Sequence, residues 1–199
     1  MKEMWNQRYA EHELVYGEAP NTFLKAFIDR EEPGSILLPA EGEGRNAVYA
    51  ASMGWEVFAM DFSTVAQEKA LRRARQRGLA LTYEVADITS WEFDRQVDLV
   101  ALIFAHLAPE NRKAVHRKLT GYLKPGGTML LQAFSRDQIK YNSGGPKNID
   151  WLYSPEMLRD DFRNLKIEML EAKTEDLDES RFHQGKAGTI RMIARKIKN

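Results

Sequence analysis

The sequence predicts a doubly wound α/β fold with a mostly parallel sheet, and three observations support this prediction. From Ile36 to Phe134, strand-like and helix-like segments alternate, as in parallel sheets that carry helices on both faces. Residues 97–104 are an almost continuous apolar run, which is typical of a strand buried on both sides. After Ser135, two strand-like segments follow without a crossover helix between them, so they must pair antiparallel if they pair. We therefore expect seven strands that end in an antiparallel hairpin.

Each element is predicted from its pattern of apolar residues and from its end signals. Ser63 and Ser154 are the expected N-caps of two helices, and Pro155 fits the first helical position. A turn is expected at 124–127, and a loop at 141–150. The predicted helices are 1–10, 21–30, 45–53, 63–77, 109–122 and a short one after Ser154, and the predicted strands are a run that opens at Ile36, then 55–60, 79–85, 97–104, 128–134, 165–173 and 188–197.

Composition narrows the class of protein. The 199 residues contain no internal repeat and no recognisable linker, which predicts one domain with a sizeable core. Because 29 basic residues balance 29 acidic ones, net charge predicts neither a nucleic-acid partner nor a membrane surface. The absence of cysteine excludes disulfides and thiolate metal sites, and no other metal-ligand spacing is present. With no apolar run long enough to cross a bilayer, we expect a cytoplasmic protein, monomeric or homodimeric.

The stretch Ile36–Asn46 predicts a ligand-binding turn. Its apolar strand ends in Gly42 and Gly44, whose lack of a Cβ lets the backbone approach a ligand at the start of the next helix. The same residues fit the G-x-G-x-x-A pattern of dinucleotide-binding proteins, and an ordinary tight turn is the alternative. Asp61, at the end of the second strand, favours a nucleotide because a carboxylate there can accept both ribose hydroxyls. NAD and S-adenosylmethionine fit this pattern equally.

With these landmarks, the chain resembles the class I S-adenosylmethionine-dependent methyltransferases over nearly its whole length. Ile36–Asn46 looks like their first motif, Asp61 takes the ribose-binding place, Ala86-Asp87-Ile88 takes the adenine-binding place, and Leu123–Gly127 resembles the turn before their fifth strand. Within this group, the segments 5–9, 16–17, 20–21 and 182–187 look like the small enzymes related to tellurite-resistance and thiopurine methyltransferases. The resemblance implies a Rossmann-like fold, S-adenosylmethionine as cofactor, S-adenosylhomocysteine as product, and a small-molecule acceptor.

The resemblance also implies a division of the single domain and a set of site residues. Residues 1–34 would be a helical cap or lid, 35–134 the cofactor-binding core, and 135–199 the substrate side with the final hairpin. The expected cofactor-binding residues are Arg8, Tyr16, Glu41, Gly42, Gly44, Asn46, Asp61, Phe62, Ala86, Asp87, Ile88 and Phe104. The expected substrate-side residues are Trp5, Tyr9, Tyr141 and His183, and the candidate catalytic residues are His106 and His183.

Several of these residues have a plainer interpretation. His106 would follow the fourth strand, either as a proton acceptor beside the sulfonium or as a residue that anchors the loop. Asp87 could cap a turn, His183 could belong to a solvated charged turn, and the aromatic residues could only pack. The basic run 69–77 favours a solvated helix face over an RNA-binding one.

The first motif departs from the family pattern, because Leu38 stands at its usual acid and Ala40 at its first glycine. Glu41 is the expected substitute for the acid. This departure leaves a non-catalytic S-adenosylmethionine-binding module as one alternative, and an NAD-dependent oxidoreductase remains the other.

Overall fold

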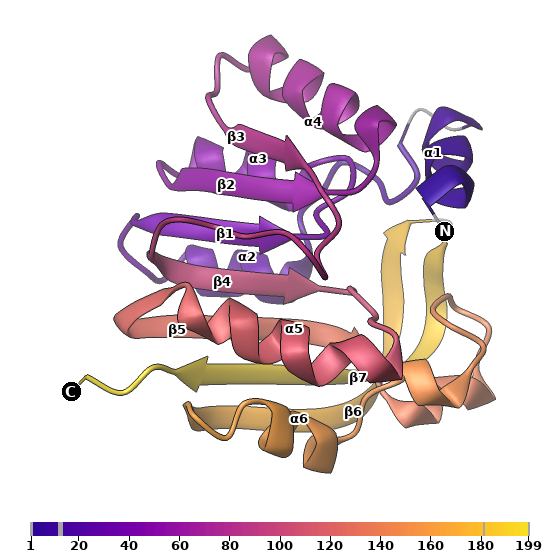
Figure 1. Ribbon diagram of the computed structural model, residues 1–199. Helices are drawn as coiled ribbons and strands as arrows, with labels where there is room; N and C mark the ends of the chain where they lie inside the picture. The colour runs from indigo at the N-terminus through magenta and orange to yellow at the C-terminus, as the bar shows by residue number, and fades with distance from the viewer. Residues whose placement is uncertain (1, 12–13, 181, 199) are drawn as a thin grey trace. The chain divides into compact units, whose positions relative to one another are not determined.

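The computed structural model describes residues 2–11, 14–180 and 182–198, and the chain divides into two compact units. The first unit comprises Met1–Glu92 with Glu179–Arg181, and the second comprises Phe93–Asp178 with Phe182–Asn199. The strands follow one another in the order β3-β2-β1-β4-β5-β7-β6 (Figure 1). This order confirms the predicted seven-stranded, mostly parallel fold with a C-terminal antiparallel hairpin.

The first unit is built on three parallel strands. Strand β1 pairs with β2, and β2 pairs with β3, so their carboxyl ends lie at one edge. Helix α3 packs on β1 and β2, α4 packs on β2 and β3, and α1 packs on α4 (Figure 1). Its elements are α1 (Lys2–Glu11), α2 (Thr22–Ile28), β1 (Ser35–Pro39), α3 (Arg45–Ser52), β2 (Glu56–Asp61), α4 (Thr64–Gln76) and β3 (Thr82–Val85).

The second unit joins a parallel pair of strands to an antiparallel one. Strand β4 pairs parallel with β5, and β5 pairs antiparallel with β7. Helix α5 packs on β5 and against α6 (Figure 1). Its elements are β4 (Val97–Ile103), α5 (Pro109–Gly121), β5 (Leu123–Phe134), the 3₁₀ helices η1 (Arg136–Lys140) and η2 (Ile149–Trp151), α6 (Pro155–Asp161), β6 (Lys166–Ser180, whose last two residues belong to the first unit) and β7 (His183–Arg195).

Local sequence explains where the main helices begin. The hydroxyl of Ser63 accepts a hydrogen bond from Ala66 N at 3.1 Å, and the hydroxyl of Ser154 accepts one from Met157 N at 3.4 Å. Both N-cap predictions are therefore confirmed. Every residue of β1 is buried, as expected for a strand covered on both faces.

Three boundary predictions are wrong. The predicted turn at 124–127 lies inside β5, as an irregularity where the pairing register with β4 shifts between Val97 and Leu99. The strand predicted at 165–173 continues as β6 to Ser180. The strand predicted to begin at 188 begins instead at His183, as β7. Among the described residues, no helix combines the length and apolar character that a membrane span requires.

Candidate cofactor and acceptor sites

The turn after β1 requires its glycines. Gly42 and Gly44 have φ angles of 61° and 78°, a region that favours glycine. A Cβ at Gly44 would lie 2.6 Å from the Cβ of Ala70, so this glycine lets α4 pack directly on the turn. Ala40 also has a positive φ, 53°, at the position of the family's first glycine. The backbone shape of the motif is thus present even where its glycine is replaced.

Asp61 ends β2 beside this turn. Its Oδ2 accepts a hydrogen bond from Gly42 N at 3.1 Å, and its Oδ1 accepts one from Ser63 N at 2.9 Å. Burial raises the pKa of this carboxyl, and the amide hydrogen bonds oppose that shift. An ionised carboxylate has about four acceptor positions, so Asp61 retains capacity for ribose hydroxyls.

Glu41 is directed at helix α3. Its Oε1 accepts from the amides of Asn46 and Ala47 at 2.9 and 2.7 Å, and its Oε2 accepts from Asn46 Nδ2 at 3.2 Å. Burial raises the pKa of Glu41 to about 7 despite these contacts. Asn46 is buried too, and its Oδ1 accepts from Asn21 N at 2.9 Å. Both residues fix the first turn of α3.

The predicted adenine-side residues follow β3. Ala86 N donates to Asp61 O at 3.0 Å, which brings the ends of β2 and β3 together. Asp87 is exposed, and its Oδ1 accepts from both the amide and the hydroxyl of Thr89 at 2.9 and 2.7 Å. The predicted turn-capping contact of Asp87 is therefore present, and its adenine contact stays a prediction. Phe62 and Ile88 are partly buried beside these two strand ends.

The N-terminal candidates form one cluster against the turn. Trp5 stacks on Tyr9 with ring centroids 5.6 Å apart, and it lies 6.3 Å from the ring of Tyr16. The guanidinium of Arg8 lies 4.8 Å from the Trp5 ring and bonds to the Tyr16 hydroxyl. A Cβ at Gly42 would lie 2.7 Å from the hydroxyl of Tyr9. Helix α1 therefore places aromatic side chains beside the glycine turn at Gly42.

Sequence reasoning missed a set of buried charges that surrounds this turn. Lys69 and Arg73, predicted to lie on a solvated helix face, are only 9 % and 8 % exposed. They recur on α4 with Ala66, Ala70 and Ala74, so their spacing on the alanine-rich face was the available signal. Glu43, between the two glycines, is 5 % exposed.

In the second unit, Phe104, Phe134 and His183 form an aromatic cluster. The Phe104 ring lies 4.8 Å from that of Phe134 and 4.5 Å from that of His183. Phe104 has a φ of 51°, an uncommon backbone conformation for a bulky residue. His183, whose plainer interpretation was a residue of a solvated charged turn, is only 6 % exposed. Tyr141 lies at the end of η1 and is partly buried.

Both ring nitrogens of His106 bond to the backbone. Nδ1 lies 2.7 Å from Trp151 O, which can only accept, and Nε2 accepts from Phe134 N at 3.2 Å. These partners fix the neutral tautomer with its proton on Nδ1. Burial lowers the pKa of His106 to about 4. The contacts favour the interpretation of His106 as a loop anchor, and its catalytic role stays a prediction.

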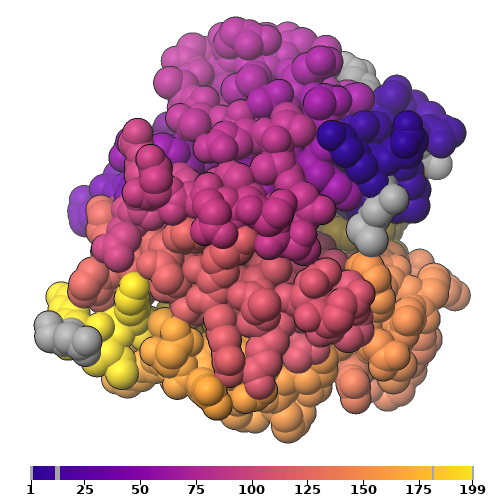
Figure 2. Space-filling view, in the orientation of Figure 1, coloured from indigo at the N-terminus to yellow at the C-terminus, as the bar shows by residue number. Residues whose placement is uncertain are grey.

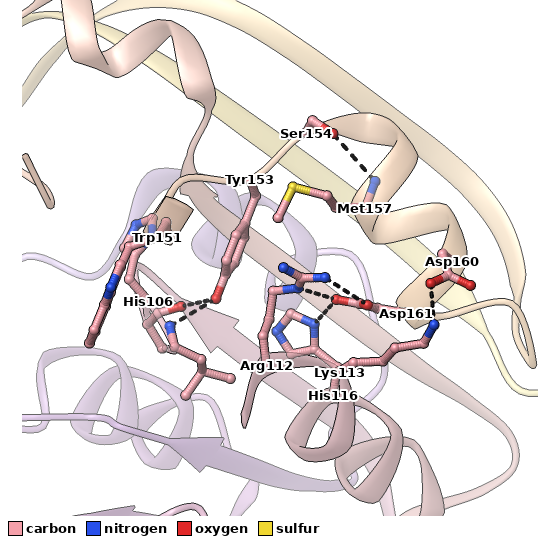
Figure 3. Close-up of polar contacts among 12 residues, drawn as sticks. His106, Arg112, Lys113, His116, Trp151, Tyr153, Ser154, Met157, Asp160 and Asp161 are labelled. Atoms are coloured by element: carbon pink, nitrogen blue, oxygen red, sulfur yellow. Dashed lines mark hydrogen bonds and ion pairs between the residues drawn. The ribbon is translucent and has the colours of Figure 1, made fainter. Parts of the chain in front are cut away.

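Tyr153 holds the ends of β4 and β5. Its side chain is fully buried; its hydroxyl accepts from Leu107 N at 3.1 Å and donates to Ala105 O at 3.0 Å (Figure 3). Its backbone amide donates to Phe134 O at 3.1 Å. The sequence contained no motif that marked this tyrosine.

A buried ion cluster packs against the ring of Tyr153. Asp161 accepts from Arg112 Nε at 2.7 Å and from His116 Nδ1 at 2.8 Å, which clamps α6 to α5 (Figure 3). Burial lowers the pKa of His116, and Asp161 opposes that shift. The His116 ring meets the edge of Tyr153 at 5.5 Å.

Comparison with known proteins gives the class to which this architecture belongs. Residues 36–127 match the model of the family described as Methyltransferase domain. A search of curated proteins returns no match. Among solved structures, one concerned with conversion of a disulfide bond into a thioacetal group during echinomycin biosynthesis is similar at 21 % identity, over 100 % of this chain and 93 % of that chain, with a TM-score of 0.77.

Two further structures share the fold. TehB from Haemophilus influenzae has a TM-score of 0.75 at 17 % identity, over 98 % of this chain and 66 % of that chain. A SAM-dependent methyltransferase from Methanosarcina mazei has a TM-score of 0.72 at 17 % identity, over 91 % of this chain and 100 % of that chain. Residues 36–127 thus match a methyltransferase domain, and the whole fold is one that solved S-adenosylmethionine-dependent methyltransferases share.

The residues present fit S-adenosylmethionine, the cofactor that the sequence resemblance implies. The first unit offers a glycine turn in which a Cβ would collide with Tyr9 or Ala70, and a buried carboxylate at the adjoining strand end. Asp61 supplies the acceptor chemistry that a ribose diol requires.

Proposed function

We propose that the protein transfers the methyl group to a small-molecule nucleophile by in-line displacement. Bound S-adenosylmethionine supplies a methyl group already activated by the sulfonium. The chain then needs chiefly to align the acceptor atom and to exclude water. The observation that carries the proposal is the pairing of Asp61 with the Gly42 amide, because it joins an acceptor for ribose to the glycine turn.

Within this proposal, Asp61 binds the ribose, while Ala86, Asp87 and Ile88 contact the adenine. Glu41 acts through the turn, because its three hydrogen bonds to Asn46 and Ala47 hold the start of α3, whose N-cap is Gly44. Arg8 and Tyr16 contribute from the N-terminal segment, which we propose to be a lid. This assigns the methionine end to backbone groups and to the lid.

For the acceptor, we propose a nucleophile that needs no general base. Both nitrogens of His106 are already used by the backbone, and burial keeps its pKa near 4. Phe104, the partly exposed member of the aromatic cluster with Phe134 and His183, would offer an apolar contact to an uncharged or soft acceptor. Similarity in fold to the protein of echinomycin biosynthesis is consistent with sulfur chemistry on a small molecule.

The test is the release of S-adenosylhomocysteine from S-adenosylmethionine over a panel of thiols, selenium and tellurium oxyanions, amines and phenols. We expect turnover with a thiol, an oxyanion or an unprotonated amine, and an unchanged rate with His106→Gln wherever that variant is folded. Turnover with protein or RNA acceptors alone would overturn the small-molecule assignment. Cofactor binding without turnover by any acceptor would favour the non-catalytic module.

A further inference from the structure

Lys69 links helix α4 to the N-terminal segment. Its side chain is 11 % exposed, and its ammonium donates to Glu43 Oε1 at 2.9 Å and to the main-chain oxygen of Tyr9. A lysine in this environment loses most of its hydration, so both contacts are needed to compensate for its burial.

Glu43 continues the same connection. Its Oε2 accepts from Val15 N at 2.7 Å, so the acid between the two glycines binds the N-terminal segment with one oxygen and Lys69 with the other. Arg73, one turn further along α4, donates to Glu43 O at 3.0 Å and to Glu18 O at 3.2 Å. Among the described residues, Lys69, Glu43 and Arg73 therefore hold the main chain of the segment at Tyr9, Val15 and Glu18.

The contact with Tyr9 bears on the cofactor turn. The backbone of Tyr9 is held by Lys69, and its hydroxyl lies where a Cβ of Gly42 would be 2.7 Å away. Trp5 stacks on the other side of Tyr9. Figure 2 shows α1, in indigo, as a surface helix beside α4. A marginal ten-residue helix at the surface needs tertiary contacts to remain in place.

We propose that Lys69 is a positioning residue for cofactor binding, which acts through Tyr9. The ion pair with Glu43 prearranges the N-terminal segment against the glycine turn, so that binding does not have to order it. An isolated buried ion pair seldom adds net stability over apolar residues, and conformational specificity is the better-attested use of such a pair. Preorganisation raises affinity because a smaller ordering cost opposes binding. This inference rests on the proposed use of the segment as a lid.

Calorimetric titration with S-adenosylhomocysteine tests the proposal. We expect Lys69→Met to weaken binding roughly tenfold, which corresponds to the loss of one charge-assisted hydrogen bond. The matched control is Arg72→Met, which removes an exposed cation from the same helix and should bind like wild type. Hydrogen exchange should be faster in the variant at the amide of Val15, which bonds to Glu43.

A double variant separates positioning from stability. Lys69→Met alone leaves the Glu43 carboxylate buried without its cation, and Lys69→Met with Glu43→Gln removes that charge. We expect the double variant to recover melting temperature but to remain weak in binding, because the contact with Tyr9 is still missing. If binding recovers together with melting temperature, the role of Lys69 is structural and the proposal is wrong.

The other outcomes are equally decisive. If wild type and Arg72→Met bind the product and folded Lys69→Met binds it equally well, this inference fails while the proposed function stands. If folded wild type binds neither S-adenosylmethionine nor S-adenosylhomocysteine, the proposed function fails first. If Lys69→Met does not fold, the double variant takes its place, and wild-type affinity in it overturns the proposal.

Discussion

At the scale of single residues, the polar groups around the glycine turn divide into two kinds. Glu41, Asn46 and Glu43 use their side chains on the protein itself. Asp61 differs in its position, because it ends β2 beside the glycine turn, where its carboxylate accepts from backbone amides and still has acceptor capacity. Among these four, Asp61 is therefore the residue whose replacement should affect the cofactor most directly.

We expect Asp61→Ala to weaken binding of S-adenosylhomocysteine by roughly tenfold to a hundredfold, since hydrogen bonds to a charged group contribute about 1.5–3 kcal/mol. Titration calorimetry measures the change. Glu68→Ala, which removes an exposed carboxylate from α4, is the control. Because Asp61 also bonds to Ser63 N and Gly42 N, circular dichroism must first show a folded variant. Unchanged affinity in that folded variant would contradict the ribose assignment.

At the scale of elements, short polar bridges hold strand ends where no regular pairing does. Strand β4 ends at Ile103, and the loop after it is held by the hydroxyl of Tyr153 and by both ring nitrogens of His106. At the end of α6, Asp161 bonds to Arg112 and His116 and so fixes this helix on α5. Burial acts to raise the pKa of Asp161, but hydrogen bonds from His116 and Arg112 outweigh it and leave this pKa below its usual value.

We expect Tyr153→Phe to lower the free energy of unfolding by about 2–4 kcal/mol, because it leaves two buried backbone groups, Leu107 N and Ala105 O, without this partner. The phenyl ring stays and preserves packing on His116. Urea denaturation measures the loss. Tyr141→Phe, at a partly exposed tyrosine, should change stability by no more than a few tenths of a kcal/mol. Equal stability of wild type and Tyr153→Phe would show that the hydroxyl does not support the loop.

The elements also show what could be predicted from sequence. Strands β1, β2 and β4 and helices α3, α4 and α5 have strong apolar patterns and clear end signals, and the structure confirms them within a few residues. The second half of β6 could not be predicted, because Glu171–Ser180 is rich in acids and mostly not buried. Its strand conformation depends on its neighbour in the sheet rather than on a hydrophobic face.

The sequence predicted the strand-end and turn residues of the candidate site, but not the buried charges that hold them in place. Asp61 and the glycines were found because strand ends and glycine turns are local signals. Lys69 and Arg73 were assigned to solvent, since charged residues on a helix are usually exposed. Their partners Glu43, Tyr9 and Glu18 lie far away in the sequence, and only the tertiary structure shows these pairings.

At the scale of the whole molecule, buried titratable groups should set the pH dependence of stability, and they act in opposite directions. Burial holds the pKa values of His106 and His116 below the usual 6.5. Below pH 6.5 the unfolded state therefore binds more protons at these residues, and acidification destabilises the fold. Burial raises the pKa of Glu41 from 4.5 to about 7. Between these pH values the folded state binds more protons at Glu41, so acidification stabilises the fold there. Burial also raises the pKa of Asp61, so this residue changes the stability with pH in the same direction as Glu41.

Replacing Glu41 by Gln should therefore make the protein more sensitive to acid. Glutamine does not titrate, and it loses the hydrogen bond from Asn46 Nδ2, since Asn46 Oδ1 is already held by Asn21 N. Between pH 8 and pH 5, the stability of Glu41→Gln relative to wild type should fall by about 2 kcal/mol, from the shift in the pKa of Glu41. Urea denaturation at the two pH values measures this change.

Glu68→Gln, an exposed matched replacement, should follow wild type at both pH values. The positive charge of Arg45 favours the charged form of Glu41. A gap between wild type and Glu41→Gln that stays constant from pH 5 to pH 8 would mean that Arg45 and the amides of α3 keep Glu41 ionised throughout, and the turn would then hold a permanent negative charge beneath the cofactor.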